Sequence, residues 1–308
     1  MSLRGGDVTA GRTGRLVAGS GGAGSVTIGS TPIHPTFHAV PVPFPPLSAE
    51  KPHRLVRAVT GNHARDRPVC SPLRPPHPAM ATIDTPKPAP QIDVIRIESE
   101  PFAEHSYLVS ATGGRECVVI DPGFEPDAII DAIHASGLDP RAILVTHGHS
   151  DHIAGNATLR EAFPGLPILI GRGDAVKLVD PMANLSGLFG IPITSPPADR
   201  LLDDGEDFIV AGLRFVVAEI PGHSSGHVVF RVEGCTPAVV FGGDVLFREG
   251  VGRTDFADGD FATLARGILR HLYPLPAETV VFPGHGPETT VGHERRHNPF
   301  VPAIDEGV

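Results

Sequence analysis

The 308-residue sequence has little cysteine, no tryptophan and no long run of apolar residues. Its three cysteines, Cys70, Cys117 and Cys235, form no CxxC pair. This argues against a disulfide framework and a thiolate zinc site, and favours a reducing, cytoplasmic location. No segment approaches the roughly 18 apolar residues that a membrane helix requires. We therefore expect a soluble protein that has no membrane partner.

Basic residues are also scarce in most of the chain. Residues 1–79 contain nine of the 25 Lys and Arg but only three of the 35 Asp and Glu, which leaves 16 basic and 32 acidic residues in 80–308. Residues 80–308 therefore lack the basic surface with which a protein displaces counterions from nucleic acid or from an anionic membrane. The charge pattern therefore predicts a small-molecule partner and no nucleic acid, and it leaves the oligomeric state open.

The first 79 residues have neither helical nor strand periodicity. Gly and Pro interrupt stretches such as GGDVTAGRTGRLVAGS and PIHPTFHAVPVPFPPL. This segment buries too little apolar surface to offset the entropy lost on ordering. We predict a disordered extension over 1–79, either dispensable, with Met80 as an alternative start, or a targeting or regulatory tail. The catalytic domain is predicted over 80–308.

Short β-rich runs and helical stretches begin near Ile92. Sheets flanked by helices, in two β-rich halves with similar strand endings, predict an α/β fold of the αββα sandwich type. The elements predicted in most detail are a helix over PDAIIDAIHASG that ends near Gly137, a buried strand AILVT that ends at Thr146, a helix over 152–163, a hairpin of FIVAG with LRFVVAEI, and a helix over 261–272.

The motif THGHSDH, residues 146–152, directly follows the AILVT strand. A glycine-containing loop at a strand end lets His147 and His149 point the same way. Asp151 and His152, where the next helix begins, can turn toward a second point nearby. Imidazole and carboxylate without thiolate suit Zn²⁺, with Fe or Mn²⁺ as alternatives. The spacing therefore makes a site for two divalent metal ions possible.

Three further candidate ligands follow predicted strands: His223 in IPGHSSGH, Asp244 in FGGD and His285 in FPGHG. Glycine lets the backbone turn tightly and approach a metal closely, and strand ends hold ligand geometry rigidly. A single His in a His-rich chain is more often a surface or packing residue. Seven such residues in this order instead predict a metal cage.

The motifs HGHSDH, PGHSSGH, GGD and PGHG match, in order, the ligand motifs of the metallo-β-lactamase superfamily, which the chain resembles over residues 90–300. The resemblance implies an αββα fold with two metal ions. It also implies their ligands: His147, His149 and His223 for one metal, Asp151, His152 and His285 for the other, and Asp244 as the bridge.

Within that superfamily, LFREGVGRTDF at 246–256 and FPGHGPETTVGHERRHNPF at 282–300 are similar to the glyoxalase II group. This resemblance implies cleavage of a hydroxyacylglutathione thioester such as S-lactoylglutathione. It is closest to the short bacterial type, which lacks a C-terminal helical domain. The alternative is a persulfide dioxygenase with a single iron, a related group that shares GRTDF but has a YPAHDY-like segment where this sequence has FPGHG.

The predicted mechanism is hydrolysis by a hydroxide that bridges the two metals, since shared coordination lowers the pKa of water toward neutrality. Asp151 is the predicted catalytic residue, because it can orient this nucleophile while ligating a metal. Arg253 is the predicted substrate-binding residue, since its planar fork fits a carboxylate. An Arg253–Asp255 pair that pins the loop explains the same residues equally well.

Other polar residues receive no chemical role. We expect His105, His227, Cys117 and Cys235 to be packing or turn residues. A short helix beginning near Thr290 is predicted to present a solvated polar face, with a contribution to the pocket rim as the alternative. The residues concerned are Glu294, Arg295, Arg296 and Asn298.

Overall fold

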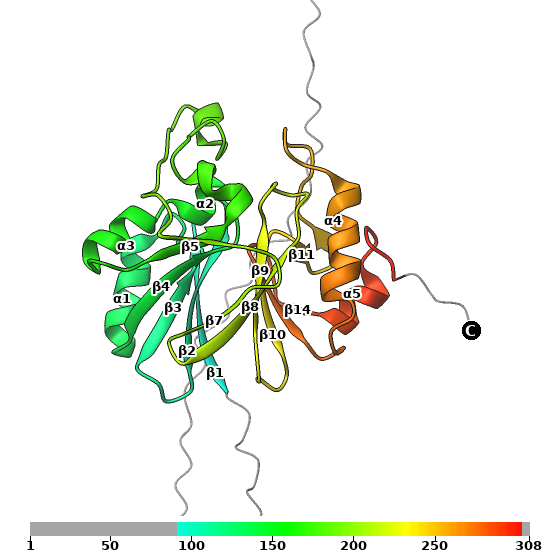
Figure 1. The fold of residues 1–308 in the computed structure, drawn as a ribbon, viewed down its shortest axis with the longest axis horizontal. Helices are drawn as coiled ribbons and strands as arrows, with labels where there is room; N and C mark the ends of the chain where they lie inside the picture. The colour runs from blue at the N-terminus through cyan, green and yellow to red at the C-terminus, as the bar shows by residue number, and fades with distance from the viewer. Residues whose placement is uncertain (1–90, 304–308) are drawn as a thin grey trace, which may run out of the picture. The chain divides into compact units, whose positions relative to one another are not determined.

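The computed structural model describes residues 91–303, so the predicted extension over 1–79 and Met80 lie outside the described residues. Two six-stranded sheets pack against each other, with helices on their outer faces (Figure 1). The prediction of an αββα sandwich is therefore confirmed. Among the described residues, no helix combines the length and apolar character needed to cross a membrane.

The first sheet joins its strands in sequence order, antiparallel from β1 to β3 and parallel from β3 to β6. Because parallel strands run in the same direction, the loops that follow β3 and β4 leave from the same edge. Its strands are β1 (Ile92–Ser99), β2 (Glu104–Ala111), β3 (Glu116–Ile120), β4 (Asp139–Val145), β5 (Ile168–Gly171) and β6 (Arg200–Leu202).

The second sheet has the order β14-β13-β10-β9-β8-β7, in which only β10 and β13 are paired in parallel. A separate two-stranded hairpin, β11–β12, follows β10. The strands are β7 (Asp207–Val210), β8 (Leu213–Glu219), β9 (Val228–Val232), β10 (Val239–Gly243), β11 (Leu246–Phe247), β12 (Gly250–Val251), β13 (Val280–Pro283) and β14 (Thr289–Thr290).

Helices cover the outer face of each sheet: α1 and α3 lie on the first, and α4 and α5 on the second (Figure 1). Two 3₁₀ helices, η1 and η2, lie between β5 and β6. The helices are α1 (Pro126–Ser136), α2 (Ser150–Ile153), α3 (Asn156–Ala162), η1 (Arg172–Leu178), η2 (Ser186–Phe189), α4 (Phe261–Gly267), the π-helical η3 (Ile268–Leu272) and α5 (Val291–His297).

Alternation along the strands divides the apolar residues among three layers. On β2, Tyr107 packs between the two sheets with Phe230 and Phe241, whereas its neighbour Leu108 packs against α1 on the other face. Successive strand side chains point to opposite faces, so one strand contributes to both layers. The core thereby holds both sheets and their covering helices in fixed positions, which keeps the loops at the sheet ends in register.

Most of the predicted elements are confirmed. Helix α1 ends at Ser136, where Gly137 adopts a left-handed conformation with φ of 65°. The β7–β8 hairpin pairs Val210 with Leu213. Helix α4 continues directly into η3, which together span the helix predicted over 261–272.

The single helix predicted over 152–163 is wrong, because the chain forms α2 and α3 separated at Gly155. The Gly155 amide donates a hydrogen bond to the Pro122 carbonyl at 2.8 Å. A Cβ at this position would lie 2.8 Å from the Gly123 carbonyl oxygen. Close contact with the β3–α1 loop therefore interrupts the helix and requires glycine, and the periodicity of the segment does not reveal that contact.

Candidate metal centre

Five of the seven predicted ligands lie in loops that follow β4, β8, β10 and β13, Asp151 and His152 lie in α2, and all seven meet at one end of the sandwich. β10 and β13 are parallel neighbours, so Asp244 and His285 emerge side by side. The backbone is tight here: a Cβ on Gly284 would lie 2.3 Å from Asp244 Oδ1. Glycine beside the ligand is thus required by close packing against the opposite loop.

Three imidazoles form the first donor set, His147, His149 and His223. His147 Nε2 lies 3.1 Å from His149 Nδ1 and 3.1 Å from His223 Nε2. All three residues are buried. One nitrogen from each therefore converges on a single point beneath the surface.

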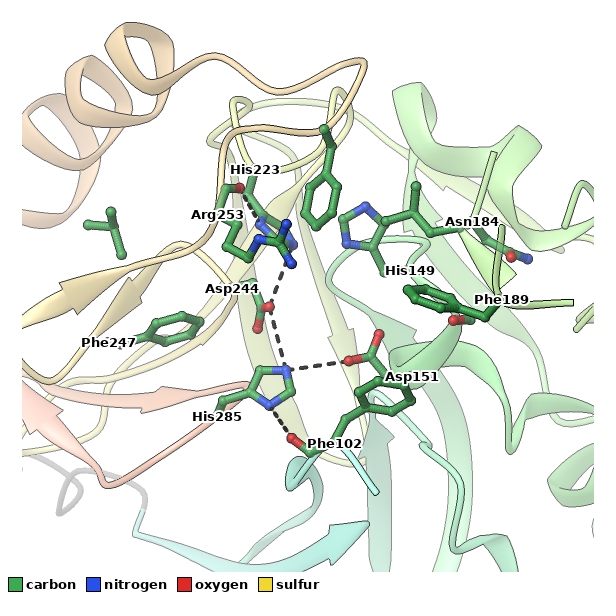
Figure 2. Close-up of a pocket in the computed structure, with 14 residues that line it drawn as sticks. Phe102, His149, Asp151, Asn184, Phe189, His223, Asp244, Phe247, Arg253 and His285 are labelled. Atoms are coloured by element: carbon green, nitrogen blue, oxygen red, sulfur yellow. Dashed lines mark hydrogen bonds and ion pairs between the residues drawn. The ribbon is translucent and has the colours of Figure 1, made fainter. Parts of the chain in front are cut away.

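A carboxylate and two imidazoles form the second donor set, Asp151, His152 and His285. Asp151 Oδ2 lies 3.5 Å from His285 Nε2 and 3.8 Å from His152 Nε2. In Figure 2, His285 lies between Asp151 and Asp244, and both contacts are drawn. These donor atoms converge on a second point.

Asp244 lies between the two sets. Its Oδ2 is 3.5 Å from His223 Nε2 of the first set and 3.5 Å from His285 Nε2 of the second. Its Oδ1 is 3.5 Å from His152 Nε2. A single carboxylate therefore contacts donors of both sets, which is the arrangement a bridging ligand requires.

The donor sets fit divalent metal ions. Ligands about 2.0–2.1 Å from a tetrahedral ion are roughly 3.3 Å apart, close to the 3.1–3.8 Å separations found here. His152 Nε2 and Asp244 Oδ1 are buried without a hydrogen-bond partner among the described residues. Buried polar atoms are normally satisfied, and a cation between them would do so. That these residues bind metal stays a prediction.

The outer nitrogens of several candidate ligands are held by other groups. His223 Nδ1 donates to the Arg253 carbonyl at 2.8 Å, and His285 Nδ1 donates to the Phe102 carbonyl at 3.1 Å. His152 Nδ1 lies 3.1 Å from Asp121 Oδ2. Such contacts fix the ring orientation and leave the opposite nitrogen free for a metal.

Sequence reasoning missed Asp121, which accepts hydrogen bonds from the Thr146 amide at 2.7 Å and the Thr146 hydroxyl at 2.6 Å. It thus ties the end of β4 to His152. A signal for it was present: Asp121 follows β3 as the predicted ligands follow their strands, in VVIDPG.

Asp174 was missed as well. This buried carboxylate accepts from the Gly148 amide at 2.8 Å and from the Gly226 amide at 2.7 Å. It therefore joins the loop that carries His147 and His149 to the loop that carries His223. No local pattern marks Asp174, because its partners are remote in sequence.

The two donor sets differ in their electrostatics. Burial lowers the pKa of His147 and of His149 well below the ordinary value. Burial also opposes the charged form of His152, but Asp151 and Asp244 outweigh it and raise the His152 pKa well above normal. Conversely, burial favours the neutral form of Asp151, yet His152 and His285 hold its pKa well below its usual range. Asp151 is therefore an ionised carboxylate.

The donor sets open into a cavity of about 290 Å³, walled partly by Phe102, Phe189, Phe247 and Phe256 (Figure 2). Arg253 also lines the cavity. Its guanidinium pairs with Asp255 through two hydrogen bonds, of 3.0 and 2.9 Å, and both side chains are exposed. The Arg253–Asp255 pair expected to pin this loop is therefore formed. Substrate binding by Arg253 stays a prediction.

Glu294 in α5 and Asn298 directly after it correct the expectation of a solvated polar face. Glu294 and Asn298 are buried, whereas Arg295 and Arg296 are exposed. Glu294 accepts from the Glu249 amide at 2.9 Å, and Asn298 donates to the Gly250 carbonyl at 3.0 Å. The reason is tertiary, because both side chains satisfy the turn of the β11–β12 hairpin. Since Phe247 and Val251 of that hairpin line the cavity, α5 supports its rim.

His227, expected to be a packing residue, is fully buried and stacks on His147 with ring centroids 4.6 Å apart. Its Nε2 also accepts a hydrogen bond from the Asp244 amide at 3.0 Å. His227 therefore positions the backbone of Asp244 in addition to packing. His105 and Cys117 are buried and Cys235 is half-buried.

Comparison with known families and proteins is consistent with this site. Residues 99–285 match the family described as the metallo-beta-lactamase superfamily. The chain is 38% identical over 207 residues to the probable metallo-hydrolase YqgX of Bacillus subtilis, covering 67% of this chain and 96% of that protein. It is 36% identical over 189 residues to the hydroxyacylglutathione hydrolase GloC of Haemophilus influenzae, covering 61% and 88%.

Three solved structures are similar to the described domain. BLEG-1, a B3 metallo-beta-lactamase, has a TM-score of 0.65 and 38% identity, covering 68% of this chain and 99% of that one. TTHA1623, solved in a di-iron-bound form, has a TM-score of 0.59 and 40% identity, covering 67% and 100%. ETHE1 from Myxococcus xanthus has a TM-score of 0.57 and 28% identity, covering 68% and 84%.

Proposed function

The chain belongs to the metallo-β-lactamase superfamily, and from that premise we propose that it is a two-metal hydrolase of thioesters, with hydroxyacylglutathiones such as S-lactoylglutathione as its substrate class. The similarity to the Haemophilus influenzae hydroxyacylglutathione hydrolase, of which it covers 88%, supports this substrate class. The segments LFREGVGRTDF and FPGHGPETTVGHERRHNPF support the same group.

The observation that carries the proposal is the position of Asp244. Its Oδ2 lies 3.5 Å from the donor nitrogens of His223 and His285, one from each set. Two ions held by these sets would share one carboxylate and face a common cavity. Two ions held there would activate water for addition to the thioester carbonyl carbon, so no Ser or Cys nucleophile would be needed.

When bound, divalent ions supply Lewis acidity that polarises a carbonyl oxygen and acidifies water. Asp151, an ionised carboxylate at the cavity wall, accepts a hydrogen bond at Oδ and so orients the attacking water. His223 and His285 keep their orientations through the carbonyls of Arg253 and Phe102. The departing thiol ionises near pH 8.5 and needs little protonation, which explains why no general acid is required.

Persulfide oxidation with a single iron is the second candidate, supported by the GRTDF segment at 252–256 that the chain shares with that group. A single-metal site needs only one donor set. Here both sets are complete, and FPGHG provides His285 to the second set. This completeness favours hydrolysis over oxidation.

The test is a paired assay on protein whose metal content has been measured. One reaction follows S-lactoylglutathione hydrolysis, and the other follows oxygen uptake with glutathione persulfide. We expect thioester hydrolysis at about two metal ions per chain. Oxygen uptake with one iron per chain and no hydrolysis would overturn the proposal in favour of the dioxygenase.

A further inference from the structure

A second, smaller cavity adjoins the metal cavity. It has a volume of about 150 Å³, and it shares Phe102, Ser150 and Phe189 with the larger one. We call it the side cavity. Figure 2 shows the rings of Phe102 and Phe189 on the side of the metal cavity where Asp151 lies. The side cavity therefore adjoins the site of the proposed reaction.

The walls of the side cavity are apolar. Apart from two serines, its lining consists of Pro and large hydrophobic side chains, among them Phe124, Ile191 and Ile193, and no charged residue lines it. The Ser186 hydroxyl already donates to Asn184 Oδ1 at 2.6 Å. Phe189 and Ile191 on its wall are 70% and 66% exposed, so the side cavity opens to solvent. Its volume is about that of a closed apolar cavity that binds benzene. The ligand that fits is therefore a phenyl group or a chain of about six carbons.

Charge distinguishes the side cavity from the Arg253 side of the metal cavity. At the metal cavity, the Arg253 guanidinium lies 4.8 Å from the Phe256 ring centroid and pairs with Asp255. This end of the cavity is therefore polar. A thioester has two ends, and the thiol carrier bears polar groups, whereas the acyl group can be pure hydrocarbon. The polar carrier fits the Arg253 end, and the acyl group fits the side cavity.

We propose that the side cavity is an acyl subsite, so that thioesters of apolar acids, with about six carbons or a phenyl group, are better substrates than those of short acids. The proposal rests on the proposed thioester hydrolysis and extends its acyl range from short hydroxyacyl groups such as lactoyl to longer apolar ones. Each buried methylene should raise kcat/KM up to about fourfold. We expect hexanoyl to exceed acetyl by at least about tenfold on the same small neutral thiol, N-acetylcysteamine.

Two variants on one loop provide a matched test. Ile191 and Leu188 are 66% and 64% exposed, but only Ile191 lines the side cavity. Ile191→Asp should bring the hexanoyl rate down to the acetyl rate without changing the acetyl rate. Leu188→Asp makes the same charge change and should alter neither. Equal rates for both thioesters in the unaltered protein, or equal effects of the two variants, would overturn the proposal.

Binding separates this proposal from the proposed reaction. Amide analogues of the two thioesters resist hydrolysis, and calorimetry on zinc-loaded protein gives their dissociation constants. If neither these thioesters nor S-lactoylglutathione is cleaved, the proposed function fails, but tighter binding of the hexanoyl amide, abolished by Ile191→Asp alone, still supports the acyl subsite. Equal binding of both amides overturns it. A concentration-dependent dimer that Ile191→Asp dissociates, with equal amide binding, would assign this surface to a second copy of the chain instead.

Discussion

The first and second donor sets occupy the same end of the sandwich but differ in exposure and charge. The first set contains only imidazoles and is buried beneath the cavity. The second contains the carboxylate of Asp151, and the side chains of Asp151 and His285 are 19% and 26% exposed. The first set is thus the more enclosed and holds neutral imidazoles, whereas the second is more exposed and contains an ionised carboxylate. Both sets line the same cavity, and the comparison indicates that the second set is its more exposed side.

The direction of the histidine pKa shifts follows the same division. In the first set, burial lowers the pKa of His149, so the imidazole is neutral at neutral pH and one of its nitrogens carries no proton. In the second set, Asp244 and Asp151 outweigh burial and raise the pKa of His285. Metal ligands must be deprotonated. The second set therefore releases protons when it binds a cation, whereas the first does not.

Asp244→Asn should have the largest effect, because it weakens the one ligand that the two sets share. We expect kcat for the thioester to fall by about 10³-fold, which is several kcal/mol of transition-state stabilisation. Steady-state kinetics on metal-quantified protein provide the measurement, with circular dichroism to check the fold. Asp255→Asn, on the exposed rim, is the control. Near-normal turnover in folded, metal-loaded Asp244→Asn protein would contradict the shared-carboxylate interpretation.

Removing one ligand from each set tests whether the sets bind separate ions. His285→Ala should lower the metal content from about two ions per chain to about one, and His149→Ala should remove the other ion. Turnover should fall about 10²-fold in each case, since half of the charge stabilisation is lost. Mass spectrometry of dialysed protein counts the ions. Loss of both ions in His285→Ala would mean that the sets act as one site.

Asp121→Ala should affect one set more than the other, since Asp121 orients His152 of the second set. Loss of such an outer partner typically costs about 10- to 100-fold in metal affinity. Competition with a chromogenic chelator should therefore show one weakened ion and one that is nearly unchanged. Equal weakening of both ions would indicate that Asp121 acts through the Thr146 loop instead.

The smallest expected effect is the pH dependence of the metal-free protein. The lowered pKa of His149 means that the unfolded chain gains a proton below about pH 6.5 that the folded chain does not, so stability falls on acidification. The raised pKa of His285 has the opposite sign, and its stabilisation is lost as pH rises through the folded-state value.

Unfolding by denaturant between pH 5 and pH 8 measures both slopes. Each proton contributes at most about 1.4 kcal/mol per pH unit. His149→Gln should reduce the loss of stability at acidic pH. His285→Gln should reduce the loss of stability at higher pH. Identical slopes in both variants would contradict the electrostatic difference between the donor sets.

Several features of the site were predictable because they are local. Each candidate ligand follows a strand and has glycine close by in the sequence, and strand ends are readable from short apolar runs. The break at Gly155 and the burial of Glu294 were not, because both depend on contacts with loops that are distant in sequence. Periodicity describes one segment at a time, so it predicted one helix where there are two and a polar face where a carboxylate is buried.

The sequence by itself determined the sandwich architecture and the residue types at its loops, since alternation, turns and strand-end motifs depend on short-range patterns. The family resemblance already implied Asp244 as the bridge, but only the tertiary structure gave its distances to both donor sets and decided that an apolar side cavity adjoins them. These arrangements depend on distances between atoms from different strands and loops. Such distances are set by the packing of two sheets and their covering helices, which no short stretch of sequence encodes.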